Sequence, residues 1–290
     1  MELGSSELIL NADKSVYHLN LRPEELAETI ITVGDPDRVA LVSQYFDTIE
    51  VKKQKREFHT HTGRIGNKRI TVISTGIGTD NIDIVLNELD ALVNIDFETR
   101  SIKKEKVVLD IIRIGTSGAI QPQIPVDSYL YSEYAIGLDN LMHFYESVAI
   151  QQADLQRAFI AHMGWSGGKL SPYAVSSDPT LADMFASDQM LSGFTTTNVG
   201  FYGPQGRCLR LRLADDHMKE KMASFNFHGK QITNLEMETS GIYGLAALLG
   251  HRALSLNCIL ANRSTGEFSS DSNKAIQGLI TYALDRVVSY

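Results

Sequence analysis

Two glutamates, Glu236 and Glu238, stand two residues apart in the stretch NLEMETSGIYGLAALLGH, where an apolar strand gives way to a helix. Apolar residues at helical spacing predict the buried face of that helix: Ile242, Leu245, Ala246 and Leu249. Buried carboxylates need partners, and a ligand rich in hydroxyl groups would supply them, because ionised carboxylates only accept hydrogen bonds. The alternative is that Glu238 and Thr239 simply cap the helix at its positive end. This stretch alone favours neither interpretation.

A buried arginine is the second feature that could do chemistry. Residues 107–114 read VVLDIIRI, a nearly continuous apolar run that predicts a strand covered on both faces, and Arg113 lies at its end. A guanidinium there needs an anionic partner, and Thr116 and Ser117 of the following GTSG add hydroxyl groups. Because open α/β sheets bind ligands at the carboxyl ends of their strands, we expect an anion site here.

Two further segments carry weaker signals. The predicted strand at 30–33 ends at Gly34 in TVGDPDRV and runs into an apolar helix, so backbone N–H groups and Arg38 could meet an anion, although one glycine also simply makes a turn. Gln205 and Arg207 follow a Gly-Pro turn in FYGPQGRCLRLRL. A glutamine that donates and accepts beside an arginine suits the edge of a carbonyl-rich ring. Taken alone, however, this segment is more typical of an exposed polar loop.

A metal site has little support in the sequence. His59 and His61 alternate on a predicted strand and therefore share one face, where they could bind a metal. No third ligand is evident nearby, which favours a solvated edge strand.

The composition is that of an ordinary globular protein. The 290 residues are 43% hydrophobic and 21% charged, and the net charge of −8 argues against a general nucleic-acid binder. Cys208 and Cys258 suggest no disulfide framework and fit a reducing compartment. The amino-terminal stretch lacks the features of a signal peptide, and no apolar run approaches the ~20 residues of a membrane helix. We therefore expect a cytoplasmic protein without membrane or nucleic-acid partners.

Strands and helices alternate along the whole chain, with no repeat and no long linker. This order predicts one domain over residues 1–290, a three-layer α/β/α arrangement around a central sheet. Helices are expected at 154–162, at 181–190 and after the capping pair Asp271 and Ser272, and a buried strand at 253–261.

The motifs GDPDRV, REF, STGIG, RIGTSGAIQP, QGR and NLEMET, in this order and spacing, resemble the nucleoside phosphorylase superfamily and, within it, the uridine phosphorylases. The resemblance runs from about Val16 to the last helix. It implies a mixed central sheet and a pentosyltransferase that converts uridine and phosphate into uracil and ribose 1-phosphate. It implies no metal and no organic cofactor, although some relatives bind a monovalent cation at the subunit interface.

The resemblance also implies a role for each matching residue. Phosphate is expected to contact Gly34, Arg38, Arg56, Arg113 and Thr116. Ribose is expected to contact His18, Glu236, Met237 and Glu238. The base is expected to contact Phe201, Gln205, Arg207 and Arg263. Arg113, Glu238, Gln205 and Arg207 are the expected catalytic residues. Because family members supply the histidine and the REF arginine from a neighbouring subunit, the chain is expected to form a homodimer or hexamer in which His18 and Arg56 are donated across the interface.

Two details bear on the choice of base. Purine phosphorylases of this superfamily carry an aspartate after the last core strand, and the corresponding position here is Asn262, which favours a pyrimidine. Residues 179–198 look longer than in the better-known bacterial uridine phosphorylases. They are expected to form an insertion that covers the base pocket.

Three other functions compete with this interpretation. A purine or broad-specificity phosphorylase is opposed by Asn262 and Gln205. A nucleosidase of the same fold, which uses water, would not need three arginines around an anion. A nucleoside-binding protein without catalysis is opposed by the presence of Glu238 and of all three arginines.

Overall fold

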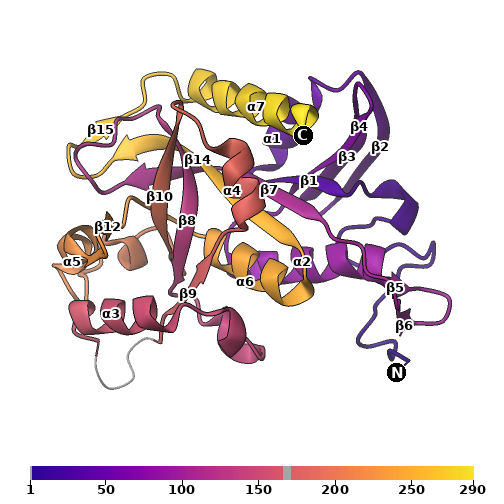
Figure 1. Cartoon of the computed structure of the whole chain (residues 1–290), viewed down its shortest axis with the longest axis horizontal. Coiled ribbons are helices and arrows are strands. Elements are labelled where there is room, and N and C mark those ends of the chain that lie inside the picture. Colours follow the sequence, from indigo (N-terminus) through magenta and orange to yellow (C-terminus); the bar gives the residue numbers. More distant parts are fainter. Residues whose placement is uncertain (1, 166–170) are drawn as a thin grey trace.

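The computed structural model describes residues 2–165 and 171–290, and within them eleven strands form one mixed sheet (Figure 1). The strands of this sheet are β1 (Thr29–Val33), β2 (Thr48–Lys55), β3 (Phe58–Ile65), β4 (Lys68–Ser74), β7 (Asp110–Ala119), β8 (Tyr129–Gly137), β9 (Tyr173–Ser176), β10 (Met190–Thr197), β13 (Asn234–Glu236), β14 (Arg252–Asn262) and β15 (Glu267–Phe268). Two small pairs lie outside it: β5 (Ile95–Asp96) with β6 (Ser101–Ile102), and β11 (Asn226–Phe227) with β12 (Lys230–Gln231).

Helices cover both faces of the sheet. They are α1 (Pro36–Ser43), α2 (Thr79–Asn94), α3 (Ala153–Met163), α4 (Pro179–Phe185), α5 (Met218–Ser224), α6 (Thr239–Leu249) and α7 (Ser272–Ser289). Short 3-10 turns occur at η1 (Pro23–Glu25), η2 (Leu141–Phe144), η3 (Val148–Ile150) and η4 (Gly203–Gln205). In Figure 1, α1 and α7 lie on one side of the sheet, and α2 and α6 lie on the other. The predicted three-layer fold with a mixed central sheet is confirmed.

Strand direction determines which chain segments meet. β1 pairs in parallel with β4 and β7, and β7 pairs in parallel with β14, so the carboxyl ends of these four strands share one edge. β13 runs antiparallel to β7, with Leu235 opposite Gly118. Because of this reversal, the chain that leaves β13 at Glu236 returns toward the middle of β7. There it places the paired glutamates beside Arg113.

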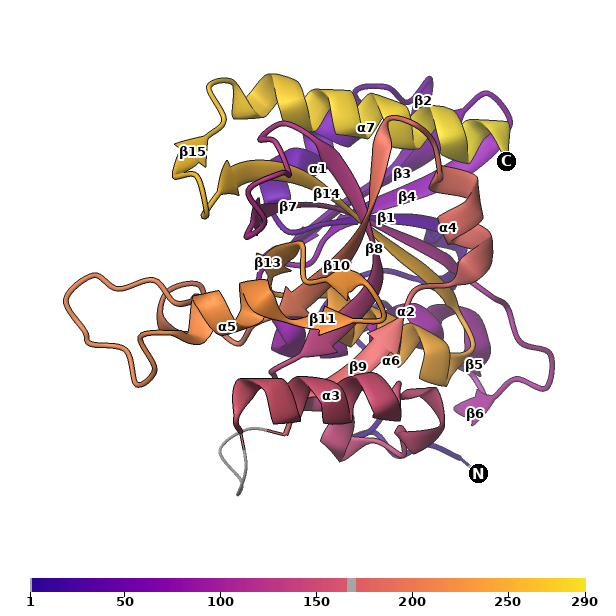
Figure 2. The same ribbon diagram turned by 60° about the vertical axis from the view of Figure 1, so that its left-hand side comes forward.

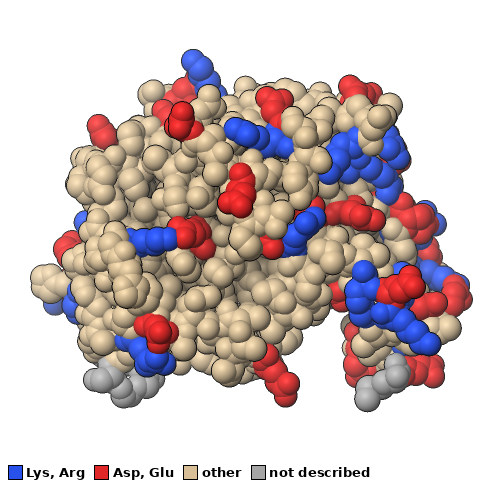
Figure 3. Space-filling model, viewed as in Figure 1, with Lys and Arg blue, Asp and Glu red and all other residues tan. Residues whose placement is uncertain are grey.

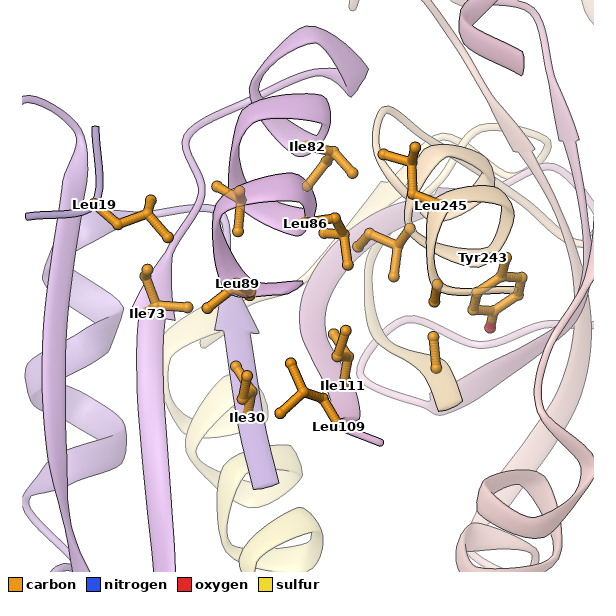
Figure 4. Packing of buried hydrophobic residues seen from close by; sticks show 14 of the residues in the cluster. Leu19, Ile30, Ile73, Ile82, Leu86, Leu89, Leu109, Ile111, Tyr243 and Leu245 are labelled. Atoms are coloured by element: carbon orange, nitrogen blue, oxygen red, sulfur yellow. The ribbon is translucent and has the colours of Figure 1, made fainter. Parts of the chain in front are cut away.

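Separate apolar clusters fill the two sides of the sheet. One cluster packs α2 and α6 against β1, β4 and β7. Figure 4 shows Leu86 and Leu89 of α2 facing Ile111 and Ile30 of the sheet, and Ile82 facing Leu245 of α6. The other cluster holds α1, α4 and α7 against the opposite face. Burial of these side chains, worth about 1.5–3 kcal/mol each before entropy is counted, keeps the strand ends of the site rigid.

Sequence periodicity located most elements correctly. The buried stripe of α6 contains Ile242, Leu245 and Ala246, as predicted, with Leu249 half-buried at the end. Asp271 caps α7 by accepting a hydrogen bond from the backbone N–H of Lys274 at 3.0 Å. The helix predicted at 154–162 is α3, and the strand predicted at 253–261 is β14.

Three expectations about local structure are wrong. Residues 179–198 do not cover the base pocket, because they form α4 and then β10, which pairs with β8 and β13 inside the sheet. The helix predicted at 181–190 ends at Phe185, and Met190 already begins the strand. Arg113 lies inside β7 rather than at its end, because pairing with β14 and β13 continues the strand to Ala119. The segment that does project is the loop at 207–217 before α5 (Figure 2).

The histidine pair is not on an edge strand. β3 lies between β2 and β4, and β2 forms the edge. His61 Nδ1 is 2.7 Å from the hydroxyl of Ser43, and burial, with smaller contributions from Lys52 and His59, lowers the pKa of His61. Among residues 2–165 and 171–290, no three histidine, cysteine or acidic side chains lie close enough to hold a metal ion.

The surface carries charges of both signs. Figure 3 shows them gathered most densely at the end that carries β2 to β6, while the middle of that face is mostly uncharged. In the described part of the chain, no helix combines the length and the apolar character that crossing a membrane requires.

Candidate active site

A cavity of about 870 Å³ opens at the shared carboxyl edge of the strands. Ten of the predicted site residues line it: Gly34, Arg38, Arg113, Thr116, Phe201, Gln205, Arg207, Glu236, Met237 and Glu238. They come from four separate stretches of sequence. The fold therefore brings together two arginines, two carboxylates and a glutamine–arginine pair in one cavity.

Arg113 is the buried cation of the cavity, with 5% of its surface exposed. Its side chain extends over Gly115, where an added Cβ would lie 1.8 Å from Nη1. Nη2 donates to Glu238 Oε2 at 2.6 Å, and Nη1 donates to Asn257 Oδ1 at 3.1 Å. The guanidinium is thus held between a carboxylate on one side and a neutral amide on the other.

Positive charge is concentrated beside this pair. Arg38 donates to the backbone oxygen of Ile114 at 3.3 Å, and burial, followed by repulsion from Arg113, lowers the pKa of Arg38. Burial would also lower the pKa of Arg113, but attraction by Glu238 and Glu236 outweighs it and the pKa is raised. The two cations repel each other, while Glu238 and Glu236 attract Arg113 and Asp35 attracts Arg38. An added dianion would relieve the repulsion.

The two glutamates do different work. Glu236 Oε2 accepts hydrogen bonds from the backbone N–H groups of Glu238 and Thr239, both at 2.8 Å, and Oε1 accepts from the Thr197 hydroxyl at 2.6 Å. Glu236 therefore caps α6, the role that the sequence had offered to Glu238. Glu238 makes no capping bond; it accepts from the Gly78 backbone at 2.8 Å and pairs with Arg113.

Opposing effects act on the pKa of the Glu238 carboxyl group. Burial raises the pKa of its carboxyl group, Arg113 opposes this rise, and Glu236 adds to it, so that the pKa is raised. A carboxylate held this way gains from any hydroxyl group that donates to it. This geometry suits the hydroxyl groups of a sugar.

Arg207 organises the loop that carries Gln205. Its guanidinium carbon lies 3.8 Å from the centre of the Phe201 ring, and Nη1 donates to the Phe201 backbone oxygen at 2.7 Å and to Gln205 Oε1. Gln205 is 2% exposed, and with its oxygen held by Arg207 its Nε2 remains for a ligand oxygen. Burial and then repulsion from Arg263 lower the pKa of Arg207 to about 10.

Three predicted site residues do not line the cavity. His18 Nδ1 bonds Glu88 Oε1 at 2.6 Å on the outside of α2. Arg56 is exposed in the turn between β2 and β3, where its φ is +55°. Arg263 donates to the backbone oxygens of Gln205 and Gly206, so it fastens the base loop from outside.

Asn262 also lies away from the ligand space. Its Nδ2 donates to the backbone oxygens of Gln121 and Ile124 at 2.9 and 2.8 Å, and its Oδ1 accepts from the backbone of Ser264. Since the amide is fully used within the protein, the argument that drew a base preference from Asn262 fails. The prediction of a pyrimidine base then rests on Gln205 and Arg207.

Sequence reasoning missed several lining residues, including Glu57, Ile77, Asn81 and Phe268. Glu57 follows Arg56 in the REF motif, and Ile77 and Asn81 lie in STGIGTDN, so motif proximity could have identified these three. Phe268 reaches the cavity through the β14–β15 hairpin, which no local pattern in the sequence indicates.

A second hollow of about 1,090 Å³ lies between the 207–217 loop, the end of α3 and α5. It is larger, but it contains none of the groups at the strand ends except Arg207. The concentration of buried charge therefore identifies the smaller cavity as the candidate active site.

Comparison with known proteins agrees with this geometry. Residues 28–288 match the family described as the phosphorylase superfamily. A crystal structure of a nucleoside phosphorylase from Trypanosoma brucei, described as showing uridine phosphorylase activity, superposes with a TM-score of 0.87 and 30% identity over 98% of this chain and 100% of that one.

Two curated relatives are more distant. A uridine phosphorylase of Thermococcus kodakarensis is 28% identical over 89% of this chain and 81% of its own length. A DeoD-type purine nucleoside phosphorylase of Bacillus velezensis is 24% identical over 86% and 89% of the two chains. With a family match over nearly the whole length and a cavity lined by the motifs that define the resemblance, the chain belongs to the phosphorylase superfamily.

Proposed function

We propose that the protein catalyses the phosphorolysis of a pyrimidine nucleoside, with uridine and phosphate giving uracil and ribose 1-phosphate. The observation that carries the proposal is the order of groups along one cavity. Arg113 extends over Gly115 of β7 and bonds Glu238, with Arg38 beside it. Arg207, which holds Gln205, lies next to Gly118 further along the same strand. The relatives described as uridine phosphorylases support the same reaction.

In this mechanism, phosphate attacks the anomeric carbon as the bond to the base nitrogen breaks. Arg38 and Arg113 hold the dianion in position, and Thr116 and the backbone at Gly34 complete its site. Glu238 accepts hydrogen bonds from the ribose hydroxyls and places negative charge beside the developing ribosyl cation. The reaction involves no change of oxidation state, and we propose that phosphate is the co-substrate and that no metal or organic cofactor takes part.

The departing base needs stabilisation of negative charge on its carbonyl groups. Gln205 and Arg207 offer N–H donors, and Arg207 is a cation that burial and Arg263 have already destabilised. An anion forming beside it would relieve that cost, so the interaction strengthens as the bond breaks. Hydrolysis by water would leave the repulsion between Arg38 and Arg113 unrelieved, which favours phosphorolysis.

The first test is release of free base from uridine, thymidine and inosine, each with and without phosphate. We expect phosphate-dependent release of uracil together with ribose 1-phosphate. Release without phosphate would make the protein a nucleosidase, and preference for inosine would make it a purine phosphorylase. Absence of release from all three would contradict the proposed activity.

We also propose that the active form is at least a dimer in which His18 and Arg56 of one subunit complete the site of another. Both side chains lie outside their own cavity, and Arg56 is exposed. Apolar side chains are also exposed near α2, because Tyr145 bonds Asp83 of α2, and nearby Phe144 and Val148 are 84% and 87% exposed. An exposed apolar surface of this kind is typical of a protein contact.

We propose the cytoplasm as the compartment of the protein, because the free cysteines Cys208 and Cys258 fit a reducing environment.

Mixing two inactive variants tests the shared site. Arg56→Ala removes the donated arginine, and Glu238→Gln damages the site that receives it. After co-expression, a mixed dimer contains one site in which both residues are intact, so we expect activity to return to about a quarter of the wild-type level at most. If Arg56 acted within its own chain, the mixture would stay as inactive as its components.

A further inference from the structure

The pairing of β7 with β14 explains where the guanidinium of Arg113 lies. Ser255 is opposite Arg113 in the ladder, and Asn257 is opposite Gly115. Because the Arg113 side chain extends over Gly115, Nη1 arrives beside the strand neighbour of Gly115, and that neighbour is Asn257. The contact therefore follows from strand register and from the missing side chain of Gly115.

The hydroxyl groups of Ser255 and Ser132 orient the Asn257 amide. Nδ2 lies 3.3 Å from Ser255 Oγ and 3.5 Å from Ser132 Oγ, while Oδ1 accepts from Arg113. The Ser132 hydroxyl is bonded in turn to Thr195 at 2.5 Å. A reversed amide would point its N–H groups at the N–H groups of the guanidinium, so only the observed orientation is favourable.

Asn257 is a costly residue at this position. It is fully buried in the strand RALSLNCILAN, where neighbouring Leu256 and Cys258 are apolar and also fully buried. An apolar side chain would avoid the cost of burying an amide, which is repaid only when its polar atoms are bonded. The bond that the amide makes to a cation of the active site is therefore its distinctive contribution.

We propose that Asn257 is a positioning residue that holds Arg113 in the orientation needed to bind phosphate. The inference rests on the proposed function, because it assigns phosphate to Arg113. A neutral carbonyl oxygen orients the guanidinium but leaves its charge available to the dianion. A carboxylate at this position would instead add a third negative group next to Arg113, besides Glu238 and Glu236, and would repel phosphate.

Two variants separate orientation from charge. Asn257→Leu keeps the approximate size and removes the acceptor, and Asn257→Asp keeps an acceptor and adds charge. Leu256→Val is the matched control, because Leu256 is equally buried on the same strand but packs in the cluster on the opposite face. For each protein, the KM for phosphate, the KM for uridine and kcat would be measured. The increase in melting temperature with inorganic phosphate, against an equal ionic strength of chloride, would be measured as well.

We expect Asn257→Leu to raise the KM for phosphate at least roughly tenfold, as the loss of a hydrogen bond to a charged group predicts, and to change the KM for uridine less than about twofold. Asn257→Asp should also raise the KM for phosphate, and its ratio to the wild-type value should shrink as the pH is lowered and the aspartate is protonated. The control variant Leu256→Val should have a lower melting temperature, but its KM for phosphate should not rise more than its KM for uridine. If the leucine variant does not fold, the aspartate variant and its pH dependence carry the test.

Equal changes in both KM values, or an unchanged KM for phosphate, would overturn the inference. Failure of the proposed function is distinguishable, because it shows as absent turnover in the wild-type protein. In that case the increase in melting temperature with inorganic phosphate tests the positioning role of Asn257. Stabilisation of the wild-type protein that the Asn257 variants lose supports the positioning role, and absence of any stabilisation rejects it.

Discussion

The Glu238→Gln variant is expected to lose roughly 100- to 1,000-fold in kcat, the range typical when one charge-stabilising group is removed from an active site. Glutamine preserves the size of the side chain and can still bond a sugar hydroxyl. It removes the negative charge next to the ribosyl cation, and it leaves Arg113 without the carboxylate that lies 2.6 Å from Nη2. Because this charge matters most when the cation develops, kcat should fall more than the KM for uridine rises. Steady-state kinetics with uridine and phosphate varied separately would measure the effect.

A matched control exists at the other end of β7. Asp110 bonds Arg252 through Nη2 at 2.8 Å, so Asp110→Asn also breaks a carboxylate–arginine pair, but far from the cavity. This variant should lower the melting temperature and keep kcat within about twofold of the wild-type value, because the effect of a partly exposed pair is on stability alone. If Glu238→Gln behaved like Asp110→Asn, Glu238 would be a structural residue and the proposed mechanism would be wrong.

The sequence predicted the site well where function depends on residues close together along the chain. GDPDR and NLEMET place polar groups at the ends of β1 and β13, and RIGTSG lies within β7. The three motifs meet because β1 runs parallel to β7 and β13 runs antiparallel to it. Apolar residues at helical spacing located α6, since a buried helical stripe repeats at a spacing that sequence alone displays. The capping pair Asp271 and Ser272 located the start of α7. These parts of the fold are encoded locally.

The sequence failed where a role depends on distant partners. Glu236 and Glu238 have the same chemistry and almost the same position in the sequence. Only the fold shows that the Glu236 carboxylate already accepts hydrogen bonds from Thr197 and from two backbone N–H groups. Asn262 is the last residue of β14, at the position where the resemblance predicts the aspartate of purine phosphorylases. Its amide nevertheless turns toward the backbone of residues 121–124. Residues 179–198 do not cover the base pocket, because strand β10 pairs with β8 and β13, and no local pattern reveals this pairing.

The Arg207→Ala variant is expected to lower kcat/KM for uridine by roughly 100- to 1,000-fold, because one side chain serves two purposes. It holds Gln205 Oε1, which keeps the amide donor directed at the base, and it offers positive charge to the departing uracil. Arg207→Lys should recover only a small part of the loss, since an ammonium cannot stack on Phe201 and bond two oxygens as the planar guanidinium does. Stabilisation by inorganic phosphate should remain, because Arg38 and Arg113 are unchanged.

Arg210 provides the control for this prediction, because it lies three residues further along the same loop and is exposed outside the nucleoside cavity. Arg210→Ala removes the same charge from the same segment, so a general electrostatic effect on nucleoside binding would appear in both variants. We expect the Arg210 variant to keep kcat/KM within about twofold of the wild-type value. Equal losses of kcat/KM in both variants would show that the loop acts through its overall charge. If the Arg207 variant kept the wild-type kcat/KM, Gln205 and Arg207 would not be the residues that recognise the base. A loss confined to Arg207, with phosphate stabilisation intact, would locate base recognition at the pair Gln205 and Arg207.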